Sequence, residues 1–174
     1  MPESVIRRSG VEPDTFTFVG LAAGASADAI TLPNGAIAVP LALWKQRREE
    51  LAARDAPVGV WLEPAEAPEA LFDDLHGLAL VAVRFPKFTD GRGYSAAVLL
   101  RRAGYRGELR AFGDLGRDQL FYLARVGFDA FSLRPGADPH AALASLRDFS
   151  EAYQGSVNQP APLFRRRETA GTTR

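Results

Sequence analysis

Apolar runs and helical patterns alternate along the middle of the chain. Runs typical of strands occupy residues 37–39, 58–64, 78–86, 108–113 and 128–135. The run at 78–86 is apolar almost throughout, as expected of a strand that is buried on both faces. Segments with helical spacing or helix-end signals follow these runs at 41–51, 67–75, 91–105, 116–127 and 138–155. In the last of them, Asp138 stands at the N-cap position and Pro139 at the first helical position.

This alternation, at intervals of roughly 20–30 residues, predicts βα units and a parallel sheet. We expect an α/β fold with four to five βα units and a mainly parallel sheet. The units form either a partial (β/α) barrel or an open three-layer arrangement. A complete eight-fold barrel needs about 200 residues or more, and this chain has 174. A partial barrel leaves open sheet edges, which the N-terminal arm or a second copy of the chain in a homodimer must cover.

Changes in the pattern of apolar and polar residues divide the chain into three predicted segments. Residues 1–32 mix glycine, alanine and short apolar pieces without a sustained period, which predicts an arm with one short strand around Phe16–Val19. Residues 33–155 form a single α/β domain. Residues 156–174 are polar, proline-bearing and basic, which predicts a flexible tail.

The composition excludes several classes of function. Lys and Arg together number 21, as do Asp and Glu, so no overall field favours nucleic acid or an anionic membrane. The chain has no cysteine, which excludes disulfides, thiolate nucleophiles and cysteine-ligated metal centres. With only two histidines, no metal site is predicted. No apolar run reaches 18 residues and no secretory signal is recognisable, so we expect a cytoplasmic protein without a membrane span.

Charged residues gather where the predicted strands end. Ligands of parallel α/β proteins bind at the carboxyl ends of the strands, and Glu63 and Arg134 lie at two of these ends. The candidate anion- or substrate-binding residues on this rim are Arg84, Lys87, Asp90, Gly91, Arg92, Gly93, Tyr94, Ser95, Asp114, Arg117, Asp118 and Gln119. The alternative is a set of surface ion pairs, which are common at such a rim and contribute little to stability.

The loop before the predicted 91–105 helix contains a glycine motif. Gly91, Gly93 and Ala96 satisfy G-x-G-x-x-A, and Asp114 follows at about the 20-residue spacing of a ribose-binding acid. In the dinucleotide fold the first glycine comes almost directly after the strand, whereas "RFPKFTD" intervenes here. The motif therefore predicts no dinucleotide site. It predicts a helix N-terminus that favours a small oxyanion, with Asp90 as the N-cap and basic residues around it.

The stretch "RFPKFTDGRGYSAAVLLRRAGYRGELRAFGDLGRDQLFYLARVGFDAF" at 84–131 resembles the core of the domain of unknown function 934 family. The similarity extends over roughly residues 33–155 and includes "LPNGAIAVPLALW" and "FSEAYQG". Members of this bacterial family are described as oxidoreductases linked to sulfite reduction. The resemblance therefore implies an accessory protein of assimilatory sulfite reduction, with a sulfite reductase subunit as partner. It implies no particular cofactor and no catalytic residues.

Three hypotheses for the function follow. The first is an accessory oxidoreductase of sulfite reduction that binds a small oxyanion at the rim near Arg84, Lys87 and Arg92. The second is a non-enzymatic protein whose rim docks on a sulfite reductase subunit. The third is a partial-barrel hydrolase or lyase that uses Glu63, Asp114 or Asp118 as acid or base, which requires these carboxylates to share one cavity.

Overall fold

A curved sheet of eight strands forms half of a barrel in the computed structural model, which describes residues 4–20 and 30–165. The strand order is β2-β1-β8-β7-β6-β5-β4-β3, and the strands from β3 to β8 pair with one another in parallel. The strands are β1 (Ser4–Arg7), β2 (Gly10–Pro13), β3 (Thr17–Phe18), β4 (Ile37–Pro40), β5 (Val58–Leu62), β6 (Leu80–Phe85), β7 (Glu108–Gly113) and β8 (Ala130–Ser132). The expected α/β fold is confirmed in its partial-barrel form.

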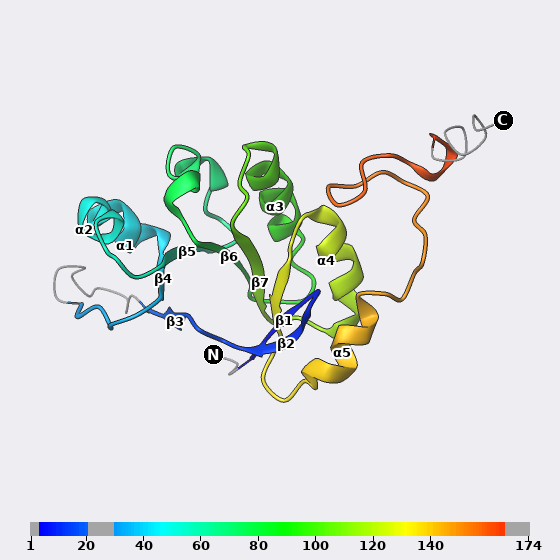
Figure 1. The fold of residues 1–174 in the computed structure, drawn as a ribbon, viewed down its shortest axis with the longest axis horizontal. Helices are drawn as coiled ribbons and strands as arrows, with labels where there is room; N and C mark the ends of the chain where they lie inside the picture. The colour runs from blue at the N-terminus through cyan, green and yellow to red at the C-terminus, as the bar shows by residue number, and fades with distance from the viewer. Residues whose placement is uncertain (1–3, 21–29, 166–174) are drawn as a thin grey trace.

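Helices cover the outer face of the sheet, as Figure 1 shows. The α-helices are α1 (Leu41–Gln46), α2 (Arg48–Ala52), α3 (Arg92–Arg102), α4 (Leu120–Val126) and α5 (Pro139–Ser145), and the 3₁₀ helices are η2 (Pro68–Leu71), η3 (Leu75–Gly77) and η4 (Arg117–Gln119). Every second strand residue, such as Val60, Val81 and Phe131, is buried in the main core beneath these helices. Because both faces of the central strands are covered, their apolar runs are nearly continuous.

The predicted strands at 37–39, 58–64, 78–86, 108–113 and 128–135 all form, within a few residues of the expected ends. The helices agree less well. The predicted 67–75 helix is wrong, since this segment forms the two 3₁₀ helices η2 and η3. Between them, the Asp74 carboxylate accepts hydrogen bonds from Trp44 Nε1 at 2.9 Å and from the Arg48 guanidinium, and these bonds hold the short connection in tight turns.

Two other predicted helices are interrupted or shortened. The helix at 41–51 breaks at Arg47, whose side chain binds the Ile30 carbonyl at 2.7 Å. The helix expected at 138–155 ends at Ser145, although Asp138 caps its start as predicted. The chain then turns so that the Phe149 ring lies 5.0 Å from that of Phe121 in α4. In both places a tertiary contact overrides the local preference for helix.

The N-terminal arm covers both edges of the half-barrel. Its strand β1 pairs antiparallel with β8, and β3 pairs with β4 at the opposite edge. The strand expected around Phe16–Val19 is therefore present as β3, whereas the β1–β2 hairpin was not predicted. Residues 14–19, called the strap below, cross the inner face of the sheet between these edges (Figure 1). Within the arm, residues 1–3 and 21–29 lie outside the described part of the chain.

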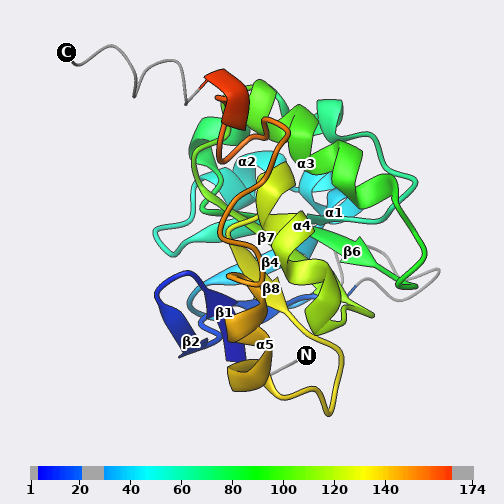
Figure 2. The same cartoon turned by 90° about the vertical axis from the view of Figure 1, so that its right-hand side faces the viewer.

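The segment after α5 runs back over α4, as Figure 2 shows. The Val157 N–H donates to the Arg125 carbonyl of α4 at 3.0 Å, and the Arg125 guanidinium donates to the Gln154 carbonyl at 2.7 Å. The predicted tail at 156–174 is therefore attached to α4 at its beginning. Its last part, 166–174, lies outside the described residues.

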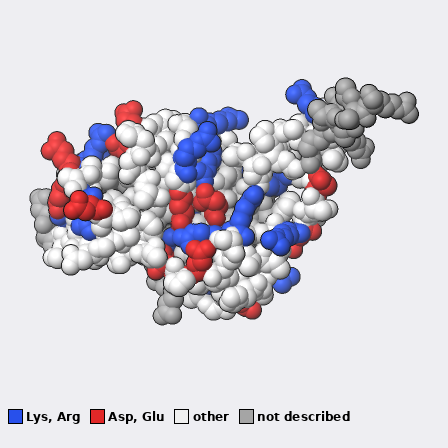
Figure 3. Space-filling view, in the orientation of Figure 1, with Lys and Arg blue, Asp and Glu red and all other residues white. Residues whose placement is uncertain are grey.

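Charge is unevenly distributed over the surface although the totals balance. Figure 3 shows Lys and Arg side chains gathered over α3, and acidic and basic side chains intermixed below it. The last turn of α3 contributes Arg101 and Arg102 to the basic group, and Arg106 follows the helix. Local clusters therefore exist that the net charge of the sequence does not reveal.

Candidate functional site

A cavity of about 580 Å³ opens at the carboxyl ends of the strands, on the inner face of the half-barrel. We call it the carboxyl-end pocket. Trp61 of β5 and Phe112 of β7 form part of its apolar lining, with their rings 6.1 Å apart, and the strap contributes Phe18. Its lining includes Phe18, Trp61, Arg84, Phe112, Asp114 and Arg134. A cavity of this size, at this end of a parallel sheet, is the usual place for a small ligand in such folds.

Small side chains on the inner face of the sheet make room for these rings. Ala38 and Ala82 are fully buried there, in a second apolar cluster with Phe112, Phe16 and Phe18. Gly59 lies against Leu80, where a Cβ atom on residue 59 would come within 2.6 Å of the Leu80 Cβ. Small residues on the sheet thus leave the space that the aromatic side chains of the strap and strands occupy.

Two ion pairs lie at the opening of the pocket. Arg84 Nη1 of β6 is 2.6 Å from Glu63 Oε1, and Arg134 Nη1 is 3.5 Å from Asp114 Oδ1. The Arg84 and Arg134 side chains are 45% and 58% exposed, so each pair contributes little to stability. Both guanidinium groups therefore remain accessible to a ligand.

A buried hydroxyl on the same face of the sheet has no partner. Ser132 of β8 is 2% exposed and is the register neighbour of Phe112. Within residues 4–20 and 30–165, its Oγ atom forms no hydrogen bond. Because neighbouring residues of parallel strands share a face, the Ser132 side chain lies on the inner face. Buried polar atoms are nearly always hydrogen-bonded, so the Ser132 hydroxyl is one of few exceptions among the described residues.

The predicted rim divides into two groups. Arg84 and Asp114 line the carboxyl-end pocket, whereas Lys87 and Arg92 do not. Arg92 instead forms an ion pair of 2.7 Å with Asp90, its Nη2 donating to Asp90 Oδ2. These hydrogen bonds from Arg92 hold the pKa of the Asp90 carboxyl below its usual value. The structure thus separates Arg84 from the other two cations of the predicted oxyanion cluster.

Gln119 ties the loop after β6 to the rest of the rim. Its Oε1 accepts from the Gly116 N–H at 3.0 Å, while its Nε2 donates to the Phe88 carbonyl at 3.1 Å. The same nitrogen lies 3.4 Å from the Tyr94 hydroxyl, and burial raises the pKa of this phenol. The contacts of Gln119 and Tyr94 thus stabilise the loop. They give no sign of ligand chemistry.

The remaining predicted residues lie outside the pocket. Ser95, Arg117 and Asp118 are exposed, and the carboxylate of Asp118 does not line the cavity that Asp114 lines. Among the described residues, no group of three or more His, Asp or Glu side chains is arranged to hold a metal ion. In the same part of the chain, no helix has the length and apolar character needed to cross a membrane.

The structure also accounts for the two glycines of the G-x-G-x-x-A motif. Gly91 is the N-cap of α3, in place of the predicted Asp90, although Asp90 Oδ1 still accepts from the Arg92 N–H at 3.2 Å. Gly93 is buried against the Phe85 ring, where a Cβ would come within 2.5 Å of Phe85 Cζ. The second glycine therefore permits close packing of helix on strand.

We predict that Gly93→Ala lowers the free energy of unfolding by about 2 kcal/mol, because the fully buried Phe85 ring must move. Gly91→Ala is the matched control, since no atom lies within 4 Å of its added Cβ, and we expect a change below about 1 kcal/mol. Urea unfolding curves of both variants measure the difference. Equal losses would show that Phe85 is not what requires glycine at this position.

A comparison of the sequence with models of protein families identifies its family. The family described as "Bacterial protein of unknown function (DUF934)" matches residues 59–164. The chain belongs to the DUF934 family. The resemblance of the 84–131 stretch is thereby confirmed, and the match starts and ends later in the chain than expected. No curated protein matches the sequence.

The DUF934 match includes only part of the carboxyl-end pocket. Trp61, Arg84 and the β7 and β8 residues of the lining lie inside the matched region. Phe18 and the remainder of the strap lie outside it. Sequence analysis missed the contribution of the strap because its residues have no regular period. The one available signal was the pair of aromatic residues, Phe16 and Phe18, two positions apart on one face of a short strand.

Proposed function

We propose that this DUF934 protein binds a small anionic ligand in the carboxyl-end pocket and acts as an accessory protein of assimilatory sulfite reduction. The observation that carries the binding proposal is the placement of Arg84 and Arg134 over an aromatic lining at the carboxyl ends of the strands. The setting in sulfite reduction, with oxidoreductase activity, rests on the resemblance of the sequence to members described in that way.

Exchange of ion-pair partners provides a route for binding. Arg84 is paired with Glu63 in an exposed position, so an oxyanion can replace the carboxylate at little energetic cost. The planar guanidinium matches two oxygens of a sulfite, sulfate or carboxylate group. Trp61 and Phe112 offer apolar surface to a ring or short chain beside the charged group.

Calorimetric titration tests the proposal. We expect sulfite or sulfate to bind the wild-type protein, and Arg84→Gln to weaken that binding about tenfold or more, because a charge-assisted hydrogen bond is lost. Nicotinamide and flavin cofactors form a second arm, in which a bound ring quenches the fluorescence of Trp61. Arg106→Gln is the control, since this exposed arginine is not part of the pocket lining. Absence of heat with every ligand, or an equal effect of both substitutions, contradicts the proposal.

An exposed aromatic residue favours docking on a partner protein as a second candidate. Phe88, in the loop after β6, is 63% exposed although its backbone is held by Asp114 and Gln119. Aromatic side chains presented on an ordered loop are typical anchors of protein interfaces. If the protein docks on a sulfite reductase subunit, the two should co-purify, and Phe88→Ala should abolish the association without changing sulfite binding.

A further inference from the structure

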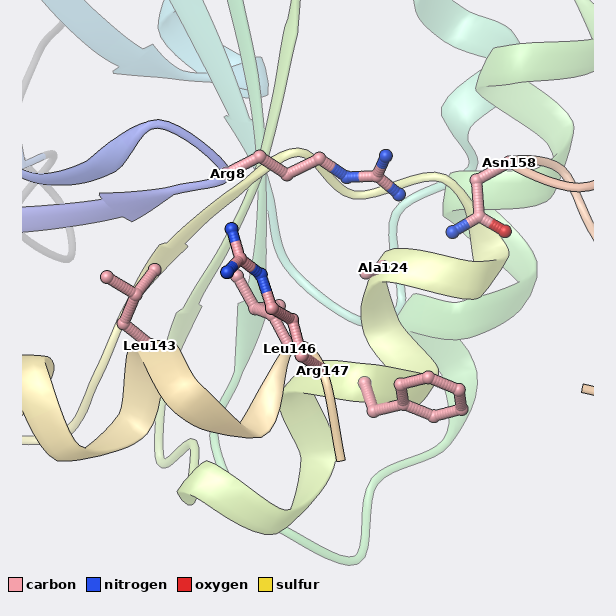
Figure 4. A pocket seen from close by; sticks show the side chains of 7 residues that line it. Arg8, Ala124, Leu143, Leu146, Arg147 and Asn158 are labelled. Atoms are coloured by element: carbon pink, nitrogen blue, oxygen red, sulfur yellow. The ribbon is translucent and has the colours of Figure 1, made fainter. Parts of the chain in front are cut away.

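A second cavity, of about 330 Å³, lies between α4, α5 and the C-terminal segment (Figure 4). Its apolar lining comes from Phe121 and Ala124 of α4 and from Leu143 and Leu146 in and after α5. None of its lining residues belongs to the carboxyl-end pocket. We call it the Arg8–Arg147 cavity, after the two cations that line it.

Three polar side chains from distant parts of the sequence meet at this cavity. Arg8 comes from the turn between β1 and β2, Arg147 follows α5, and Asn158 belongs to the C-terminal segment. Figure 4 shows Arg8 extending across the cavity toward Asn158, with the Arg147 guanidinium rising from the end of α5. The Asn158 side-chain oxygen accepts from Ser156 Oγ at 2.6 Å, which leaves the amide nitrogen as a donor. All three are therefore donors.

The two arginines lack an acidic counterpart. No Asp or Glu lines the cavity, and within residues 4–20 and 30–165 neither the Arg8 nor the Arg147 side chain forms a hydrogen bond or ion pair. By contrast, Arg84, Arg92, Arg101, Arg110 and Arg134 all pair with a carboxylate. Two like charges that face one space repel each other, although water screens this repulsion because both arginines are exposed residues. An anion in the cavity would relieve it.

The fold holds these donors in place. Arg7, beside Arg8, pairs in register with Ala130 of β8, and the chain passes from β8 into α5. The segment that contains Asn158 is anchored by the hydrogen bond of 3.0 Å from the Val157 N–H to the Arg125 carbonyl. The backbone segments that carry the three donors are therefore held by the sheet and by backbone hydrogen bonds. Such positioning lowers the entropy cost of binding.

We propose that the Arg8–Arg147 cavity is a second ligand site, which takes a small organic anion. Its oxyanion group, a phosphate, carboxylate or sulfonate, binds between the two guanidinium groups and the Asn158 amide. Its short apolar body packs on Leu143, Leu146 and Phe121. The site is separate from the carboxyl-end pocket, because the two cavities share no lining residue.

Phenyl phosphate, which joins an oxyanion to a small ring, is a suitable probe. Titration of the full ¹⁵N-labelled chain, followed by amide chemical shifts, should move the signals of Arg8 and of residues 121–125 and 143–147. We expect inorganic phosphate to bind at least tenfold more weakly, because it lacks the apolar body. Benzyl alcohol, which lacks the charge, should leave these signals unchanged.

Substitutions then test the two cations. Arg8→Gln and Arg147→Gln should each weaken phenyl phosphate binding about tenfold or more. Arg102→Gln removes an exposed positive charge from the basic group over α3 and should leave the affinity within twofold. Unchanged affinity in both cavity variants, an equal loss in Arg102→Gln, or shifts confined to Trp61, Arg84 and Phe112 would overturn the proposal. Amide spectra of the free variants show that each is folded.

Discussion

Replacing Arg110 with methionine is expected to lower the free energy of unfolding by about 3–5 kcal/mol, the usual cost of removing one partner from a buried ion pair. Arg110 of β7 has no exposed surface. Its Nη1 lies 2.7 Å from Asp14 Oδ2 of the strap, and its Nε donates to Glu108 Oε1 at 2.8 Å. The Asp14 side chain is itself only 7% exposed, so the substitution leaves a buried carboxylate without a counter-charge.

The same substitution should loosen the strap. The Arg110 guanidinium lies 5.7 Å from the ring centres of both Phe16 and Phe18, so it also contributes cation–π contacts to the strap. Glu108 keeps a second partner, since Arg7 Nη2 is 2.7 Å from its Oε2. Asp14 is therefore the group most affected. Because Phe18 lines the carboxyl-end pocket, ligand binding should weaken together with stability.

Chemical unfolding with a double-mutant cycle measures the effect of Arg110→Met. Asp14→Asn removes the stranded charge, so in the Arg110→Met background it should cost far less than in the wild type, with a coupling free energy of about 1 kcal/mol or more. Arg84→Met, which breaks an exposed pair, is the control and should cost about 1 kcal/mol at most. A loss below about 1 kcal/mol for Arg110→Met would show that the buried pair does not hold the strap.

Gly113→Ala is expected to lower the free energy of unfolding by roughly 2–6 kcal/mol. Gly113 has a φ of +115°, a conformation that costs other residues about 1–3 kcal/mol. An added Cβ would also overlap the Phe85 carbonyl oxygen, and such overlap in a core costs about 1–3 kcal/mol. The same carbonyl accepts the Asp114 N–H at 2.7 Å, so the pairing of β6 with β7 and the position of Asp114 are both disturbed.

Gly104→Ala separates the two contributions to this loss. Gly104 follows the C-cap residue of α3 with a φ of +93°, and apart from its chain neighbours no atom lies within 4 Å of the Cβ that alanine would add. This variant should show the backbone cost alone. Urea midpoints at an unchanged m-value compare the two. If Gly113→Ala costs no more than Gly104→Ala, the close approach to Phe85 is not significant.

Local patterns predicted the strands well and the helices less well, for a physical reason. A strand buried on both faces needs a run of apolar residues, and such runs are visible in the sequence whatever lies around them. The end of a helix depends on contacts that the sequence does not reveal. Phe149 leaves the helical path and its ring contacts that of Phe121, and Arg47 breaks its helix to bind the Ile30 carbonyl.

The candidate site was predicted in part. The rule that ligands bind at the carboxyl ends of parallel strands indicated the correct end of the sheet for the pocket, and it named Arg84 and Asp114, which line it. It could not tell which rim residues face the inner side. The loop after β6 turns outward to Gln119 and Tyr94, and Arg92 pairs with Asp90, so these residues stand apart from Arg84.

By itself, the sequence determined the strands β4 to β8, their parallel sheet and the membership in the DUF934 family, because these depend on local periodicity and on a continuous motif. Only the tertiary structure decided how the two edges of the half-barrel are covered and where its cavities lie. Asp14 reaches Arg110 across 96 positions of the chain, and Arg8 meets Arg147 and Asn158 at one cavity. Such contacts depend on strand pairing between distant segments, which no local pattern encodes.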